Sequence, residues 1–405
     1  MNFVGLAAAY LRRRWGQACL SVLVGALGIA AIATTLLGFE ALPEAARQAW
    51  GGVDLVVGPK GSALDLVLCC ALHVSDPRGL VSTKAAMATV QGPMVRAASP
   101  IALGDNIGGW RIVGATPAIL DIYRAAFADG QAWTDKLQAV LGARAAQALH
   151  LKVGDSFVGV HGLVAGGEAH AHFPYRVVGI LKPTGSVVDQ LVLTDIETVR
   201  YIHEEQAKIE IAEHGSTDEA LVANLPDAAT AIVASFRMPA AAAFLPRQID
   251  ATETLSAASP SLEIARLVSY ARPLTTAVMA LGLLLVAVAG IGAAIGLMAT
   301  MNTRTRDLAL LRALGAGPIH LALVAFAEAA IIAVAALAVG AVFTTGLLAV
   351  LRTLLAESTG LLLQPHPSLD QIAGILAGTL LVAILAALFP ALRAAHAEVE
   401  ELLRA

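Results

Sequence analysis

Four side chains with metal-ligand chemistry lie within twelve residues of one another in the segment HGLVAGGEAHAHF: His161, Glu168, His170 and His172. Residues two apart on a strand face the same side, so an extended segment would let His170 and His172 reach one metal ion. Imidazole and carboxylate groups are ligands that zinc takes in proteins. The pattern therefore indicates a zinc site, and a polar hairpin that happens to hold histidines is the open alternative.

The sequence shows no clear motif for a disulfide scaffold or for nucleotide binding. The three cysteines, Cys19, Cys69 and Cys70, are too few for a disulfide scaffold, and the neighbouring pair lies in the apolar run LVLCCALHV, where packing is the expected role. The chain has no G-x-x-x-x-G-K-[ST] phosphate loop. We therefore expect no catalytic residue and no cofactor on this chain, and any ATP hydrolysis requires a separate polypeptide.

The composition indicates a membrane protein. Of the 405 residues, 57% are apolar and only 14% charged, with a mean hydropathy of +0.72. A soluble domain carries about 25% charged residues. The net charge of −4 argues against a nucleic-acid partner, which a basic surface would attract.

Four apolar segments are long enough to cross a bilayer, which takes about 20 residues per helix. They are residues 18–39, 274–298, 319–351 and 371–389. The third is longer than one crossing needs, so we expect it to tilt or to kink near Gly340. The fourth is followed by Pro390, which suits the end of a helix.

The remaining segments complete a plan of one span, a large polar domain and three further spans. They are an interfacial helix over residues 1–17, an extracytoplasmic domain over 40–272, a cytoplasmic segment over 299–318, an external loop over 352–370 and a cytoplasmic tail over 390–405. Basic residues gather before the first span and between the second and third spans. By the positive-inside rule, both ends of the chain are cytoplasmic and the large domain lies outside.

The expected fold class is an α-helical membrane protein with four transmembrane helices and an extracytoplasmic α+β domain. Strands are expected at residues 53–58, 110–114, 175–181 and 229–236, and a helix at 195–203. The domain holds seven of the ten histidines. A helical pattern over residues 261–272 leads directly into the second span.

Several motifs follow one another in a recognisable order. VLGARAAQALHLKVGDSF, YRVVGILKPTG and VLTDIETV lie in the domain, RTRDLALLRALGAGPIHLALVAFAEAAIIAVAALAVG follows the second span, and FPALRAAHAEVEELLRA comes last. Together they resemble the permease subunits of the MacB, LolC/LolE and FtsX class of ABC transporters, whose external part is the MacB-like periplasmic core domain. The resemblance covers most of the chain.

This resemblance implies a non-enzymatic subunit in the cytoplasmic (inner) membrane of a bacterium. Two copies, in a homodimer, would act with a cytoplasmic ABC ATPase dimer that binds ATP and Mg²⁺. Movement of the external domain, known as mechanotransmission, would export, extract or hand over a substrate, with a periplasmic binding protein or a lipoprotein as the external partner.

The resemblance also implies roles for particular residues. The segment after the second span would be a coupling helix that docks in the ATPase, although a solvated turn is the alternative. Its contact residues would be Arg304, Arg306, Asp307, Leu308, Leu311, Arg312 and Gly315. Glu328 and Gly340 would be structural residues within the membrane. Two other functions stay open: a zinc-linked permease that uses the external histidines, and an FtsX-like regulator of an external partner without transport.

Overall fold

The computed structural model describes residues 3–162, 169–214, 227–303, 317–358 and 361–396. The chain divides into two compact units. The membrane unit comprises residues 1–42, 270–353 and 364–405, and the external unit comprises residues 43–269 and 354–363.

The membrane unit is built from helices. Their bounds are α1 Phe3–Arg13, α2 Trp15–Ala49, α10 Pro260–Thr303, α12 Pro318–Ser358 and α13 Leu369–His396. Within the described part of the chain, four helices (α2, α10, α12 and α13) are long and apolar enough to cross a membrane. The expectation of four spans is therefore confirmed.

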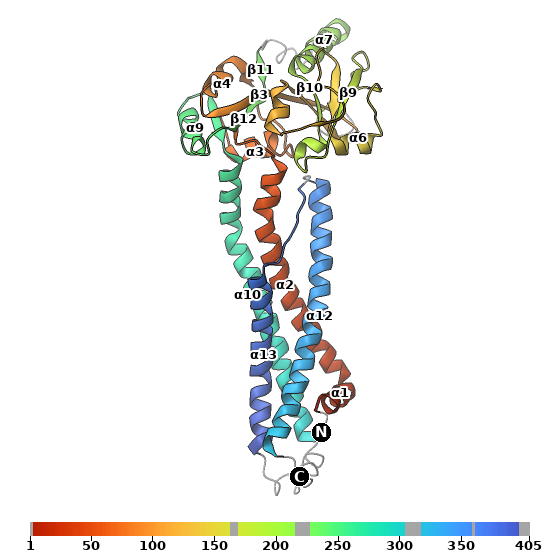
Figure 1. Ribbon diagram of the computed structural model, residues 1–405, viewed down its shortest axis with the longest axis vertical. Helices are drawn as coiled ribbons and strands as arrows, with labels where there is room; N and C mark the ends of the chain where they lie inside the picture. The colour runs from red at the N-terminus through yellow and green to blue at the C-terminus, as the bar shows by residue number, and fades with distance from the viewer. Residues whose placement is uncertain (1–2, 163–168, 215–226, 304–316, 359–360, 397–405) are drawn as a thin grey trace. The chain divides into compact units, whose positions relative to one another are not determined.

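Small residues let the four long helices approach closely, as is common between helices in lipid. The helices run side by side within this unit (Figure 1), and Ile29, Val286 and Ala336 form a buried cluster between three of them. A Cβ atom on Gly28 would lie 2.6 Å from the carbonyl oxygen of Gly282, so this contact between α2 and α10 has no room for a side chain. A Cβ on Gly340 would lie 3.0 Å from Ile29 Cγ2.

The end of the fourth span differs from the expectation. Helix α13 continues through Pro390 to His396, so the proline lies inside the helix instead of ending it. A proline removes only one backbone hydrogen bond of a helix. In membrane helices such a loss is tolerated because neighbouring groups satisfy the freed carbonyl. Proline alone was therefore an unreliable signal for the boundary.

The external unit contains a mixed sheet and short helices. Its strands are β1 Leu55–Pro59, β2 Val81–Ser82, β3 Val95–Ile107, β4 Trp110–Ala115, β5 Phe127–Gly130, β6 Gln138–Leu141, β7 Ser156–Phe157, β8 Val160–His161, β9 Tyr175–Leu181, β10 Val192–Asp195, β11 Ala228–Ala229, β12 Ala231–Phe236 and β13 Leu255–Ala258. Its helices are α3 Ala63–Cys70, α4 Thr83–Thr89, α5 Ala118–Ile122, α6 Ala143–Leu149, α7 Ile196–His214 and α9 Ala241–Asp250, with a 3₁₀ turn η1 at Val187–Gln190.

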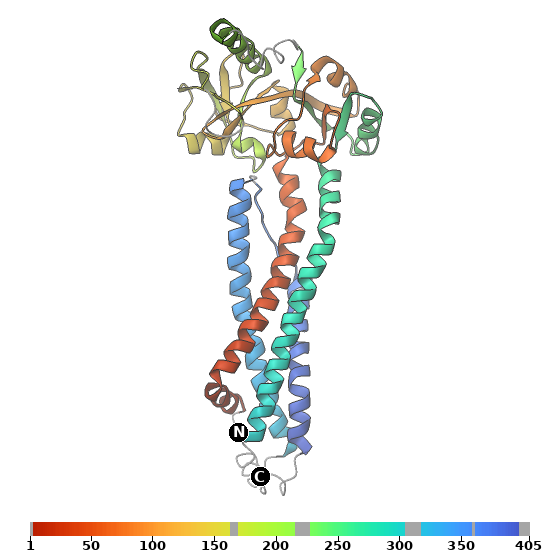
Figure 2. The same cartoon turned by 180° about the vertical axis from the view of Figure 1, so that it is seen from behind.

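The main sheet has the strand order β13-β1-β12-β3-β4-β10-β6-β9-β5, with β8 paired to β3 and β7 paired to β9. The pairs β4–β10 and β6–β9 are parallel, and the other pairs are antiparallel. Helices α4 and α9 lie at one end of the sheet and α6 at the other, as both views show (Figures 1 and 2). The α+β prediction is thus confirmed.

Strand β9 illustrates how the sequence selects this sheet. In YRVVGIL, Tyr175, Val177 and Leu181 are buried, whereas Arg176 between them is exposed, so alternate residues face the core. Helix α7 packs on β3, β4 and β10. Strand β3, at the middle of the sheet, was not expected from the sequence.

Candidate metal centre

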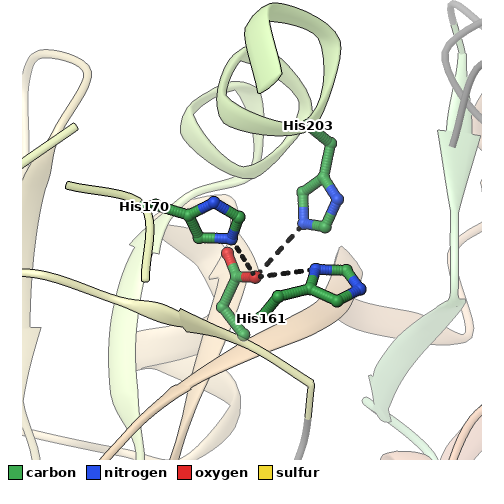
Figure 3. Close-up of side chains that lie close together, drawn as sticks. His161, His170 and His203 are labelled. Atoms are coloured by element: carbon green, nitrogen blue, oxygen red, sulfur yellow. Dashed lines mark hydrogen bonds and ion pairs between the residues drawn. The ribbon is translucent and has the colours of Figure 1, made fainter. Parts of the chain in front are cut away.

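Four side chains of the external unit converge on one point (Figure 3). Asp105 comes from β3, His161 from β8, His170 from the segment after β8, and His203 from α7. One potential ligand atom from each residue lies within 4.8 Å of the others. From Asp105 Oδ1, the distances are 3.1 Å to His170 Nε2, 3.4 Å to His203 Nε2 and 3.8 Å to His161 Nδ1.

A β-bulge aims Asp105 at this point. Between β3 and β4, Leu103 pairs with Val113 and Asp105 pairs with Ile112, so Gly104 is the extra residue on β3. A bulge of this kind bends its strand and redirects the side chain beside it. The Asp105 side chain is completely buried. The bulge therefore places a carboxylate inside the sheet layer, where an apolar residue would otherwise be expected.

Backbone pairing holds the two histidines of the β8 segment next to Asp105. His161 is the register partner of Asp105 in the β3–β8 pair. The Asn106 side chain donates a 2.9 Å hydrogen bond to the carbonyl oxygen of Gly162. The His170 backbone N–H donates to the carbonyl oxygen of Gly159 at 2.9 Å, which brings the chain back beside β8. Both rings thus reach the same carboxylate although nine positions separate them in the sequence.

The third histidine is carried by α7. Asp195 caps this helix by accepting a 2.8 Å hydrogen bond from the Glu197 N–H. Val199 and Ile202 are buried against the sheet, and His203, four residues after Val199, shares that face. A Cβ atom on Gly104 would lie 2.9 Å from His203 Nε2, so the ring occupies space that only glycine leaves open.

The cluster is buried on one side and accessible on the other. Asp105 and His170 are 0% and 2% exposed, whereas the His203 and His161 side chains are 15% and 48% exposed. His203 also lines a cavity of about 260 Å³ on the α7 side of the sheet. Solvent and small solutes therefore reach the cluster past its two outer histidines.

Electrostatics keeps the central carboxylate ionised. Burial disfavours the charged form and raises the pKa of Asp105. The hydrogen bonds with His170 and His203, and the attraction between the carboxylate and these two rings, outweigh burial and bring the pKa below its ordinary value. Asp105 is therefore deprotonated at neutral pH, and the deprotonated carboxylate is the form that binds cations.

The structure brings together two of the four candidate ligands that the sequence indicated, His161 and His170. His172 is exposed and outside the cluster, because residues 170–172 do not form a strand and the two-residue period does not apply there. Glu168 lies outside the described residues. Sequence reasoning missed Asp105 and His203, which are far from this segment in the chain. An aspartate directly after the apolar run PIALG was the available signal for the first.

The expected coupling residues Arg304, Arg306, Asp307, Leu308, Leu311, Arg312 and Gly315 also lie outside the described residues. The two residues that were expected to be structural within the membrane are among the described residues of the membrane unit. Glu328 is 5% exposed and lines a small cavity with Arg14 and Gln17, and Gly340 is buried at the contact between α12 and α2.

Comparison with known families identifies the chain. The model for the MacB-like periplasmic core domain matches residues 18–241, more than half of the chain, and the model for the FtsX-like permease C-terminal domain matches residues 277–399. The chain belongs to the MacB/FtsX-type permease family. Permeases of this family are components of ABC transporters and are not themselves catalytic, so membership implies an ABC ATPase partner. It also indicates a bacterial inner-membrane protein with its α/β domain outside.

Solved structures add only distant likenesses to this permease. The periplasmic region of MacB from Actinobacillus actinomycetemcomitans is 11% identical with a TM-score of 0.33, covering 55% of this chain and 95% of that one. The extracellular domain of the noncanonic ABC-type transporter YknZ from Gram-positive bacteria is 9% identical with a TM-score of 0.28, covering 51% and 98%. No curated protein matches the permease sequence.

Proposed function

We propose that this permease converts ATP hydrolysis by a separate cytoplasmic ATPase into movement of its external domain. In this mechanism, mechanotransmission, the substrate is exported, extracted or handed over outside the membrane. The proposal rests on the family of the chain and on the two helices that join its units.

The observation that carries the proposal is that α2 and α10 each belong to both units. Helix α2 covers Trp15–Ala49 and passes from the membrane unit to the external unit after Leu42. Helix α10 covers Pro260–Thr303 and passes between the units after Ser269. A helix transmits displacement along its axis through its backbone hydrogen bonds, of which α2 lacks the one at Pro43 and α10 the one at Pro273 while both helices continue. Displacement at the membrane end can therefore reach the external domain without an intervening loop.

The input side of this mechanism is the segment between α10 and α12. In residues 304–315, Leu308, Leu311 and Leu314 recur every three positions, a spacing that places them on one face of a helix. We propose that this face docks on the ATPase and that two copies of the permease engage an ATPase dimer. An external binding protein or lipoprotein would then receive the movement.

The test is reconstitution of the full-length permease with its ATPase in lipid vesicles. Leu311→Asp places a charge on the proposed docking face and should abolish stimulation of ATP hydrolysis by the permease. Gln364→Asp places the same charge at an exposed position in the connection between α12 and α13 and should leave stimulation unchanged. Full stimulation by the Leu311→Asp protein, inserted in membranes at the wild-type level, would exclude the coupling role.

The regulator alternative makes a different prediction in the same system. An FtsX-like regulator would show ATPase-dependent capture of an external partner but no change in the location of any substrate. Crosslinking of the external domain during ATP turnover, followed by identification of the captured molecule, separates these two outcomes.

A further inference from the structure

We propose that Asp105, His161, His170 and His203 bind one zinc ion in the external domain. This inference goes beyond the proposed function, because binding of the ion requires neither the ATPase nor movement of the domain. It rests on the type of the four donors, their distances and their exposure.

The donor set selects the metal. Three imidazoles and one carboxylate give four ligands, the number that zinc takes in tetrahedral protein sites. Calcium and magnesium prefer shells made of oxygen atoms, so three nitrogen donors argue against them. Copper(I) prefers sulfur, and the cluster contains no cysteine. Imidazole also binds copper(II), nickel and iron, and zinc is the ion proposed here because four donors of these types make up its tetrahedral set.

The distances are already close to those of a bound ion. Ligand atoms at about 2.0–2.1 Å from a tetrahedral zinc ion lie about 3.3–3.4 Å from one another. Asp105 Oδ1 lies 3.1 Å from His170 Nε2 and 3.4 Å from His203 Nε2. His161 Nδ1, at 3.8 Å from the same oxygen, needs the largest adjustment, and its half-exposed side chain has the freedom to make it. All four ligand atoms lie within 4.8 Å of one another, so the nitrogen atoms must approach each other by at most about 1.4 Å to form a coordination sphere.

A hydrogen-bond network explains the cluster less well. All three rings approach the same carboxylate oxygen, Oδ1. The other oxygen, Oδ2, is buried without a hydrogen-bond partner, as is His170 Nδ1, among the residues that the structure describes. A network built to solvate a buried carboxylate would use both oxygens, because an unpaired buried polar atom costs free energy. A shared cation, by contrast, requires one nitrogen atom from each of the three rings to lie close to the same carboxylate oxygen, as they do here.

The exposure of the ligands indicates how the ion would enter. Asp105 and His170 form a buried inner pair, whereas His161 and His203 face solvent and the cavity of about 260 Å³. The walls of that cavity carry Glu197 and Glu204 together with Lys136 and Arg200, and Arg200 pairs with Glu197, so the two pairs of charges balance and leave no net positive charge to repel a cation. An ion arriving from solvent would meet the outer histidines first. The site therefore suits exchangeable zinc better than a permanently enclosed ion.

The experiment measures zinc on the full-length permease in detergent, purified through an affinity tag without histidine and stripped with a chelator. Equilibrium dialysis against zinc, followed by elemental analysis, should give one zinc ion per chain, and Mg²⁺ should not compete. Cobalt(II) substitution should produce the intense visible absorption of tetrahedral coordination.

Variants decide whether the ion occupies this cluster. His161→Ala/His203→Ala removes the two accessible ligands and should weaken zinc binding by more than about 100-fold, because loss of an outer-sphere partner alone costs about 10–100-fold. Asp105→Asn should act in the same direction. His172→Ala removes an exposed histidine outside the cluster and should bind zinc as the wild type does.

Thermal melting shows that each variant is folded before its zinc content is compared. The proposal fails if the folded wild type binds no zinc, or if the folded double variant retains wild-type affinity. Should Asp105→Asn not fold, the double variant still decides, because its two changed side chains are not deeply buried.

Discussion

The substitution Gly104→Ala tests the geometry of the metal site without removing any ligand. The added Cβ would lie 2.9 Å from His203 Nε2 and 3.1 Å from Cε1, whereas ordinary contacts begin at 3.4 Å. The ring must therefore retreat by about 0.5 Å, which exceeds the roughly 0.2 Å tolerance of metal–ligand distances. We expect zinc affinity to fall by about 10–100-fold, the range found when a ligand is displaced through its surroundings.

The assay is zinc competition against a chromophoric chelator, with the melting temperature measured in parallel. Gly92→Ala is the matched control, since no described residue lies within 4 Å of the added Cβ. Gly104→Ala should also have no further effect in a His203→Ala background, where the ring is absent and the clash is relieved. Wild-type zinc affinity in a folded Gly104→Ala protein would refute the reasoning, as would an equal loss in both backgrounds.

Two further predictions concern stability. Burial and the nearby charge of Arg111 lower the pKa of His73 to about 3 in the folded chain, against about 6.5 in the unfolded chain. Between these two values the unfolded chain binds more protons than the folded one, so the contribution of His73 to stability is complete above pH 6.5 and is lost as the pH falls. The free energy of unfolding should be lower by about 2 kcal/mol at pH 5. Thermal melts at pH 7 and pH 5 should show a smaller drop for His73→Asn than for the wild type, and equal drops would contradict this assignment. In the membrane unit, Gly28→Ala places a Cβ 2.6 Å from the Gly282 carbonyl oxygen and should cost about 1–3 kcal/mol of stability, whereas Gly346→Ala, with no described neighbour within 4 Å, should leave the melting temperature in detergent unchanged.

Local patterns in the sequence predicted much of the fold. Apolar runs identified the four long helices, because each span needs a continuous apolar surface whatever its neighbours are. The alternation in YRVVGIL identified β9 for a similar reason, since one face of that strand is buried. Strand β3 was missed because VRAASPIALGDNI lacks this alternation: most of its central residues are buried on both faces and Gly104 interrupts the period.

Local patterns in the sequence could identify only two of the four residues of the candidate site. His161 and His170 are close in the sequence, and a search for neighbouring ligands finds them. Asp105 and His203 join them only through strand pairing and the packing of α7, which no local pattern encodes. The proximity of His172 to His170 was misleading, because a turn between them directs the two side chains differently.

The wide spacing of the four ligands has a consequence for the order of events during biogenesis. Asp105 and His170 are 65 positions apart and meet only after β3 and β8 have paired, and His203 joins them only after α7 has packed on the sheet. A nascent chain threading through the translocation machinery thus presents the histidines of residues 161–172 without Asp105 and His203 beside them. Under the zinc proposal, the ion would bind only after the external unit has folded on the outer side of the membrane. A chain with bound zinc would therefore be one whose external unit is folded.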